Sequence, residues 1–260
     1  MRTTFVRRTV LTASAVSLAL LATACGGSDK ADAKGDAKPS ASASAAAGKG
    51  KSNAELSSLI LAQADLPDYV FKQATSAEVK IGIDTVSDKA ECLPLAKAQV
   101  MTPVGMTSGT SRVKVIAKPK AADPNATAEE KLKAGMDALG GTVTSVTLAS
   151  YDGKGAEEAF ASFKGAGTAC AAGFEAKATD GSASPDNSIK FSKVVPGAQV
   201  TAGDEALAYT FQGESDGEKI STELVVVRKG SSLVTFYAVS LAGTAEQPKA
   251  VVEAQQKKLG

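Results

Sequence analysis

The chain has 260 residues, in which 29 lysines and arginines nearly balance 28 aspartates and glutamates, and it contains no histidine and no tryptophan. The lack of histidine excludes Ser-His-Asp and Cys-His catalytic arrangements, and zinc or iron sites that need histidine ligands. No basic run is interleaved with aromatic residues, which argues against a nucleic-acid partner. We therefore expect a protein that is not an enzyme and that needs no metal or cofactor.

The first 25 residues have the order of an export signal. Three arginines within the first eight residues form a positive region, and residues 10–21 are an apolar run. Small residues then precede Cys25, in an arrangement that resembles a bacterial lipobox. The sequence predicts that residues 1–24 are removed as a lipoprotein signal peptide. A diacylglyceryl group on Cys25 would then anchor the chain to the extracytoplasmic face of the cell membrane. The alternative is a secretory signal in which this cysteine occurs by chance.

The segment after Cys25 has the composition of a tether. Residues 26–52 are almost entirely Ala, Gly, Ser, Lys and Asp, with no aromatic and no branched aliphatic residue. Such a segment buries too little apolar surface to offset the entropy lost on ordering. We predict a disordered tether over 25–52, with a coil reach of roughly 30 Å, followed by a single folded domain over 53–260.

Helix and strand signals are mixed along the folded part. Ser52 and Glu55 form a capping box that begins a helix, which should end before Pro67. Apolar residues at helical spacing predict helices over 53–64, 89–99, 127–139, 155–172 and 246–259. Extended or alternating β-branched segments predict strands over 70–83, 112–117, 142–151, 189–195, 206–212, 220–228 and 233–240.

The order of these elements indicates the fold class. The last strands follow one another closely, and the turn Lys-Gly-Ser-Ser at 229–232 joins two of them. Because parallel strands need a crossover of a dozen or more residues, these strands should pair antiparallel. The sequence predicts an α+β domain, in which an antiparallel β-sheet is flanked by helices on one or both faces.

Cysteine usage adds a covalent link. The sequence has three cysteines, and acylation of Cys25 leaves Cys92 and Cys170 in a compartment that permits disulfides. Their pairing would close a loop of about 80 residues and stabilise the fold by about 4 kcal/mol on the chain-entropy model. Two buried free thiols are the alternative. A metal site is disfavoured, because two cysteines without histidine are a poor ligand set.

The order of several short motifs is similar to that of a known family. The motifs are Ala-Asp-Leu-Pro at 64–67, a cysteine in the next helix, Ala-Phe-Ala-Ser-Phe at 159–163 followed by Cys170, a hairpin at 225–230 and a last helix containing 251–256. This order resembles the extracellular sensor domain of the mycobacterial receptor kinase PknH and related actinobacterial lipoproteins. The resemblance implies an antiparallel sheet flanked by helices, a disulfide-linked frame and a cleft for an unidentified ligand. The sequence holds no kinase domain or transmembrane helix, and it has one cysteine pair where that family's kinase has two. The resemblance therefore implies a sensor-like domain and not signalling.

A possible serine-lysine pair has little catalytic support. Ser111 and Lys114 have the Ser-x-x-Lys spacing of penicillin-interacting enzymes, in which the serine opens a helix. Here the segment reads as a strand, so the two side chains should point to opposite faces.

Two adjacent acidic pairs are the remaining catalytic candidates. They are Glu157 with Glu158, and Asp204 with Glu205. Neighbouring helix residues point about 100° apart, so Glu157 and Glu158 should complement the helix dipole rather than form an acid–base dyad.

Two methionines are the candidate ligand-binding residues. Met101 and Met106 lie in an apolar loop that is rich in glycine and serine. Flexible methionines can line an adaptable binding site, and core packing beneath the loop is the alternative.

The interpretation that fits these observations is a membrane-anchored, extracytoplasmic lipoprotein with a non-catalytic binding domain. Its ligand could be a small molecule, a cell-wall fragment or a partner protein. Two other functions stay open. One is a lipid or glycolipid carrier with a continuous apolar cavity, and the other is a carboxylate-based cell-wall hydrolase with two converging acidic residues. The sequence identifies neither the ligand nor the oligomeric state, nor does it decide between Sec and twin-arginine export.

Overall fold

The computed structural model describes residues 48–118, 125–131, 141–177, 188–215, 218–240 and 244–260. The predicted signal peptide, Cys25 and most of the predicted tether lie outside these residues. Most of the helix predicted over 127–139 also lies outside them. Within the described part of the chain, no helix is long and apolar enough to cross a membrane.

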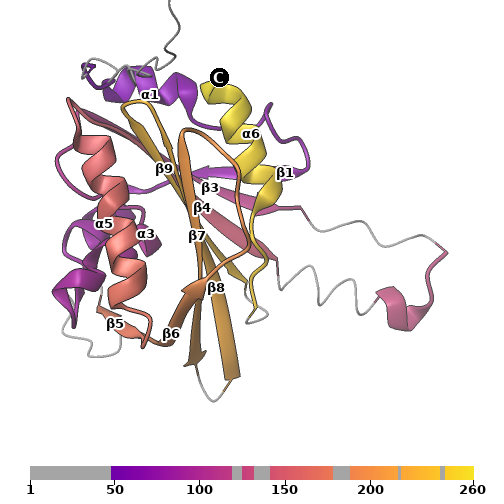
Figure 1. Ribbon diagram of the computed structural model, residues 1–260. Coiled ribbons are helices and arrows are strands. Elements are labelled where there is room, and N and C mark those ends of the chain that lie inside the picture. Colours follow the sequence, from indigo (N-terminus) through magenta and orange to yellow (C-terminus); the bar gives the residue numbers. More distant parts are fainter. Residues whose placement is uncertain (1–47, 119–124, 132–140, 178–187, 216–217, 241–243) are drawn as a thin grey trace, which may run out of the picture. The chain divides into compact units, whose positions relative to one another are not determined.

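Nine strands among the described residues form one sheet, in which every neighbouring pair is antiparallel (Figure 1). The order across the sheet is β1-β3-β4-β9-β8-β7-β6-β5-β2. The strands are β1 (Tyr69–Gln73), β2 (Val86–Ser87), β3 (Gly109–Ala117), β4 (Thr142–Ser150), β5 (Phe174–Lys177), β6 (Ser188–Pro196), β7 (Glu205–Ser215), β8 (Glu218–Lys229) and β9 (Ser232–Ser240). The α+β class with an antiparallel sheet is therefore confirmed.

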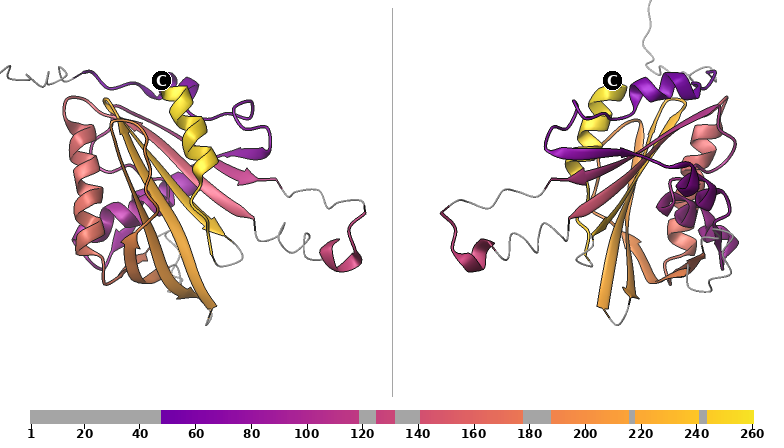
Figure 2. Two further views of the ribbon diagram at one scale, coloured as in Figure 1. Left: turned by 45° about the vertical axis from the view of Figure 1, so that its right-hand side comes forward. Right: turned by 180° about the vertical axis from the view of Figure 1, so that it is seen from behind.

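Helices cover both faces of this sheet (Figures 1 and 2). The helices are α1 (Asn53–Leu59), α2 (Ser76–Ile83), the short 3₁₀ helix η1 (Ala90–Cys92), α3 (Leu93–Gln99), α5 (Gly155–Ala169) and α6 (Lys249–Leu259). One hydrophobic core lies between the sheet and the pair α3 and α5, and a second core lies between the sheet and the pair α1 and α6. The prediction from the sequence allowed helices on one or both faces of the sheet, and the structure has helices on both faces.

The central strands explain why two helical layers are needed. Along β8, Leu224 and Val226 belong to the core beneath α3 and α5, whereas Val225 and Val227 belong to the core beneath α1 and α6. All four side chains are fully buried. A strand that is buried on both faces reads as a continuous apolar run, as this segment does.

The segment predicted to be extended over 70–83 is only partly extended. It forms β1 and then turns into α2, which begins with a capping box between Thr75 and Glu78. The Glu78 N–H donates to Thr75 Oγ1 (3.3 Å), and the Thr75 N–H donates to Glu78 Oε2 (2.8 Å). These reciprocal bonds satisfy two backbone donors that a helix start leaves unpaired, and they favour a helix over a strand.

Other boundaries differ in smaller ways. Helix α1 ends at Leu59, before the expected end near residue 64, and α6 begins at Lys249. The short strands β2 and β5 were not predicted, because neither has enough residues for an alternating pattern.

The chain is held against the domain a few residues before its predicted start at Asn53. The N–H of Gly50 donates to Asp152 Oδ1 (2.8 Å), and the N–H of Lys51 donates to Ser150 Oγ (2.9 Å). The N–H of Gly153 donates to the carbonyl of Gly48 (3.2 Å). These bonds attach residues 48–51 to the end of β4 and the turn after it.

A disulfide joins Cys92, at the end of η1, to Cys170, just after α5. The Cα atoms are 5.9 Å apart, and both residues are fully buried in the core beneath α3 and α5. The sequence predicts this pair from the number of cysteines that remain after Cys25. The bond connects segments 78 residues apart in the sequence. A closed loop of this length stabilises the folded state by about 4 kcal/mol on the chain-entropy model.

A buried glutamine connects the two helices on the other face. The side chain of Gln255 in α6 is fully buried, and its Nε2 donates to the carbonyl of Leu59 (2.8 Å). Its Oε1 accepts from the N–H of Leu61 (3.1 Å). Because α1 ends at Leu59, the glutamine pairs with a carbonyl of the last helical turn and with an N–H just beyond it, and it fixes the end of α1 against α6.

The substitution Gln255→Leu tests this connection. It keeps the side-chain volume but leaves the N–H of Leu61 and the carbonyl of Leu59 without partners, so we expect the free energy of unfolding to fall by about 3 kcal/mol. Urea denaturation followed by circular dichroism measures the change. The control Glu253→Gln, on the exposed side of the same helix, should change the free energy by no more than about 0.5 kcal/mol. Equal stability of Gln255→Leu and the unchanged protein would contradict this role.

Candidate functional site

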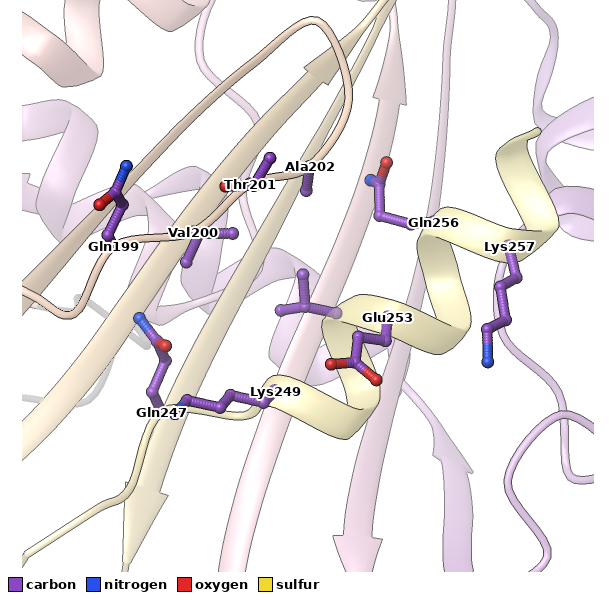
Figure 3. Close-up of a pocket in the computed structure, with 10 residues that line it drawn as sticks. Gln199, Val200, Thr201, Ala202, Gln247, Lys249, Glu253, Gln256 and Lys257 are labelled. Carbon is purple, nitrogen blue, oxygen red and sulfur yellow. The ribbon is translucent and has the colours of Figure 1, made fainter.

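A groove of about 350 Å³ lies between α6 and residues 199–202, the segment that leads from β6 to β7 (Figure 3). Helix α6 contributes residues at helical spacing, which therefore share one face of the helix. These residues are Lys249, Val252, Glu253, Gln256 and Lys257. The segment opposite contributes Gln199, Val200, Thr201 and Ala202, and Gln247 closes one end. The groove thus has aliphatic, amide and hydroxyl groups on facing walls.

Two glutamine side chains set the distance between these walls. Gln247 Nε2 donates to the carbonyl of Ala198 (2.8 Å), just before the facing segment. At the other end, the N–H of Gly203 donates to Gln256 Oε1 (2.8 Å). Gly203 has a φ of 59°, and a Cβ at this position would lie 2.3 Å from the carbonyl oxygen of Arg228, so only glycine fits there. The groove is therefore preformed.

The Gln256 amide keeps an unused donor. Its oxygen is paired with Gly203, but its Nε2 is buried and has no hydrogen-bond partner among the described residues. A buried unpaired polar group costs about 1–3 kcal/mol, so a native structure seldom keeps one without a reason. A ligand that brings an acceptor oxygen to Gln256 would remove this cost.

The charges along the groove do not form an acid–base pair. Glu253 is the one carboxylate among the described residues that line it, and Lys249 and Lys257 lie on the same helix. Hydrolysis of a glycosidic bond by carboxylates needs two acidic groups on either side of that bond. The lining can hold a polar ligand, but it offers no second carboxylate for such a reaction.

The predicted methionine candidates do not come together. Met101 is only 5% exposed and packs in the interior, and its carbonyl accepts from Arg112 Nε (2.6 Å). Met106 is 94% exposed and borders a separate pocket of about 560 Å³ next to Tyr151 and the start of α5. That pocket is larger than the α6 groove, but none of the buried unpaired polar atoms found in the described residues belongs to its lining. Packing therefore accounts for Met101, and Met106 stays a predicted ligand-binding residue at this separate pocket.

The serine-lysine pair is separated as expected. Ser111 and Lys114 lie three residues apart in β3, and so they point to opposite faces of the sheet. Lys114 forms an ion pair with Glu78 of α2. The hydrogen bond from Lys114 is the largest cause that lowers the pKa of Glu78 to about 2. Lys114 is therefore a charged structural partner and is not placed to take a proton from Ser111.

The adjacent acidic pairs also have structural roles. Asp204 Oδ2 and Glu205 Oε2 lie 3.2 and 2.6 Å from Arg228 nitrogens. Asp204 Oδ2 also accepts from the N–H of Gly230 (2.6 Å), in the turn between β8 and β9. Glu157 and Glu158 lie in the first turn of α5, where negative charge complements the helix dipole. The described residues also contain no group of three or more His, Cys, Asp or Glu side chains that could hold a metal ion.

The groove residues were not among the site residues predicted from the sequence. The available signal was the pair Gln255-Gln256, which interrupts the apolar positions of an otherwise amphipathic helix. Two adjacent amides near the apolar face indicate buried hydrogen bonding, as the structure shows for Gln255. The partner segment at 199–202 has no pattern that would place it opposite α6, because it comes from a loop far away in the sequence.

Among known proteins, the chain has a distant structural likeness and no match by sequence. No protein-family model matches the chain, and no curated protein sequence matches it. Among solved structures, it is similar to the crystal structure of the extracellular domain of PknH from Mycobacterium tuberculosis. The identity is 11% and the TM-score is 0.40, over 81% of this chain and 96% of that domain. The resemblance indicated by the sequence is thus one of fold alone, and no residue role is carried over from it.

A buried carboxylate lies on the sheet face that α6 covers. Glu223 of β8 is 8% exposed, and its Oε1 accepts from Thr210 Oγ1 of β7 (2.7 Å). Burial raises the pKa of Glu223, and the hydrogen bond from Thr210 opposes this effect. Because the folded state favours the protonated acid, the contribution of Glu223 to the free energy of unfolding is fully present below its pKa in the unfolded chain, about 4.3. The contribution is lost as the pH rises through the higher folded pKa.

We therefore expect Glu223→Gln to raise the melting temperature at pH 7, because the neutral amide avoids the cost of a buried charge and keeps a partner for Thr210. The gain should disappear below about pH 4, where the acid is protonated in both states. Melting curves from pH 3 to pH 8 measure this dependence. Glu214→Gln, at an exposed position of β7, is the control and should follow the unchanged protein. A lower melting temperature for Glu223→Gln at pH 7 would refute the assignment.

Proposed function

We propose that the protein is an exported lipoprotein, anchored through Cys25 to the outer face of the membrane, whose domain binds a ligand or partner without catalysing a reaction. The binding site is the groove between α6 and residues 199–202. The observation that carries this proposal is the buried, unpaired amide nitrogen of Gln256 in a preformed groove.

Two features support export and anchoring. A positive segment, an apolar run and small residues precede Cys25 in the order of a lipoprotein signal. The bonded pair Cys92 and Cys170 suits an oxidising compartment outside the cytoplasm, where disulfides form and persist. Between Cys25 and Gly48, the sequence has the composition of a flexible tether, which would let the domain reorient above the membrane.

The groove favours an uncharged polar ligand. Gln199, Gln247 and Gln256 provide amides, Thr201 provides a hydroxyl, and Val200 provides an apolar surface. Lysine and glutamate side chains of α6 border the same groove, so its local charge is mixed. Pockets of about 300–1,000 Å³ that combine apolar walls with a few polar groups are typical of specific ligand sites. A carbonyl or hydroxyl oxygen is the ligand atom that would pair with Gln256.

The substitution Cys25→Ala tests the anchor. It removes the thiol that would carry the lipid, so we expect the protein to leave the membrane fraction and appear in the soluble exported fraction. Cell fractionation followed by immunoblotting measures the distribution. Cys25→Ala protein that stays in the membrane fraction would refute lipid anchoring, whatever the domain binds.

Photo-crosslinking in intact cells tests the groove. We expect p-benzoylphenylalanine at position 201 to form a discrete covalent adduct upon irradiation, because Thr201 lines the proposed site. The same photoreactive residue at position 164, on the exposed side of α5, is the matched control and should give none. Mass spectrometry of the purified adduct would identify the bound molecule. Equal labelling from the two positions, or no adduct from either, would contradict binding in the groove.

A further inference from the structure

A second pocket, of about 280 Å³, lies on the opposite face of the sheet and has different chemistry. Its floor is formed by side chains of β5, β6, β8 and β9, and its wall by the end of α3. The lining is almost entirely apolar, and Ala176, Phe191, Ile220 and Val239 contribute to it. The α6 groove, in contrast, carries amides and charged groups.

A glycine lies beside two residues of this floor. Gly213 of β7 pairs with Phe191 on one side and with Ile220 on the other. A Cβ there would lie 2.7 Å from the carbonyl oxygen of Lys190, 3.5 Å from Phe191 and 3.6 Å from Ile220. The close approach of the β6 backbone therefore requires glycine at this position, and no side chain stands between Phe191 and Ile220.

Of the four polar side chains in the lining, Thr85 and Gln99 donate to the carbonyls of Ile81 and Leu95, and the other two are the hydroxyls of Thr222 and Tyr237. Thr222 is 4% exposed, and no group among the described residues meets hydrogen-bond geometry with its buried Oγ1. The Thr222 hydroxyl nevertheless lies close enough to Tyr237 to lower the pKa of that residue against the larger effect of burial. Tyr237 lines the same pocket and lies beside Thr222. Burial raises the pKa of Tyr237, so its hydroxyl stays neutral and can donate. An uncharged oxygen suits this pair, because none of the described residues that line the pocket is a cation that could balance a carboxylate.

An exposed aliphatic side chain lies at the pocket. Ile189 lines it and is 47% exposed. Ile189 pairs with Ala176, another lining residue, so the two project from the same face of the sheet. An apolar ligand in the pocket would cover part of this exposed surface.

From this geometry, we propose that the pocket binds a single aliphatic chain that ends in an uncharged polar group, such as an alcohol or ester. The polar end pairs with Thr222 and Tyr237, and the chain runs along Ile220 and leaves past Ile189. The volume holds about nine groups of the size of a water molecule or a methylene. It therefore suits one chain of medium length rather than a lipid with two long chains. This site lies on the other face from the α6 groove, so either can fail without the other.

Photoaffinity labelling of the full chain in its membrane tests the proposal. The probe is a ten-carbon primary alcohol with a diazirine in its chain, and the companion probe is the matching hydrocarbon without the hydroxyl. We expect saturable labelling by the alcohol on peptides that contain Ile189, Ile220 or Val239, and competition by unlabelled decanol. Labelling that does not saturate, or that spreads evenly over exposed peptides, would overturn the proposal.

Three variants sharpen the result. Ala176→Leu fills the pocket and should lower labelling by both probes at least about tenfold. Its matched control, Ala202→Leu, adds the same atoms in the α6 groove and should leave labelling unchanged. Thr222→Val keeps the side-chain shape and should lower labelling by the alcohol roughly fivefold, but not labelling by the hydrocarbon. Thr222→Val adds no volume to the core, so its labelling tests the proposed pocket even where Ala176→Leu folds poorly. Equal loss of both probes in Thr222→Val would overturn the role of the hydroxyl.

Discussion

Burial of β8 and β9 on both faces is the constraint on which the rest of the structure depends. Alternate residues of each strand enter two separate cores, so a helical layer must be held on each side. Each layer has its own connection. The disulfide from Cys92 to Cys170 fastens the segment at the start of α3 to the end of α5. On the other face, Gln255 fastens α6 to the end of α1 through two hydrogen bonds.

The helical layers do not cover the sheet completely, and both candidate binding sites lie at gaps in this cover. On one face, a groove separates α6 from residues 199–202, and the side chains of Gln247 and Gln256 form hydrogen bonds across it. On the other face, the second pocket lies between the end of α3 and the strands β5, β6, β8 and β9. Within the described part of the chain, each site retains a buried polar atom with no partner at hydrogen-bond geometry, in Gln256 and in Thr222. The proposed binding role rests on these two atoms beside pockets.

The sequence predicts the fold better than it predicts the sites. Continuous apolar runs, such as Leu224 to Val227, and close turns are patterns among chain neighbours, and they predict the antiparallel sheet. The number of cysteines predicts the disulfide. The capping box of Thr75 and Glu78 was equally local, but β-type residues before it obscured the helix. The groove was not predictable in the same way. It depends on hydrogen bonds between residues about 50 apart, such as Gly203 and Gln256, which leave no periodic pattern.

Native mass spectrometry would show whether the domain carries a bound molecule. The Cys25→Ala form, purified from its own host without detergent, would be measured intact and again after unfolding. We expect an added mass that is present in the folded protein, is lost on unfolding, and is reduced by Gln256→Leu or Thr222→Val. A folded protein whose mass equals that of the bare chain under the mildest conditions would rule out a bound ligand at both sites.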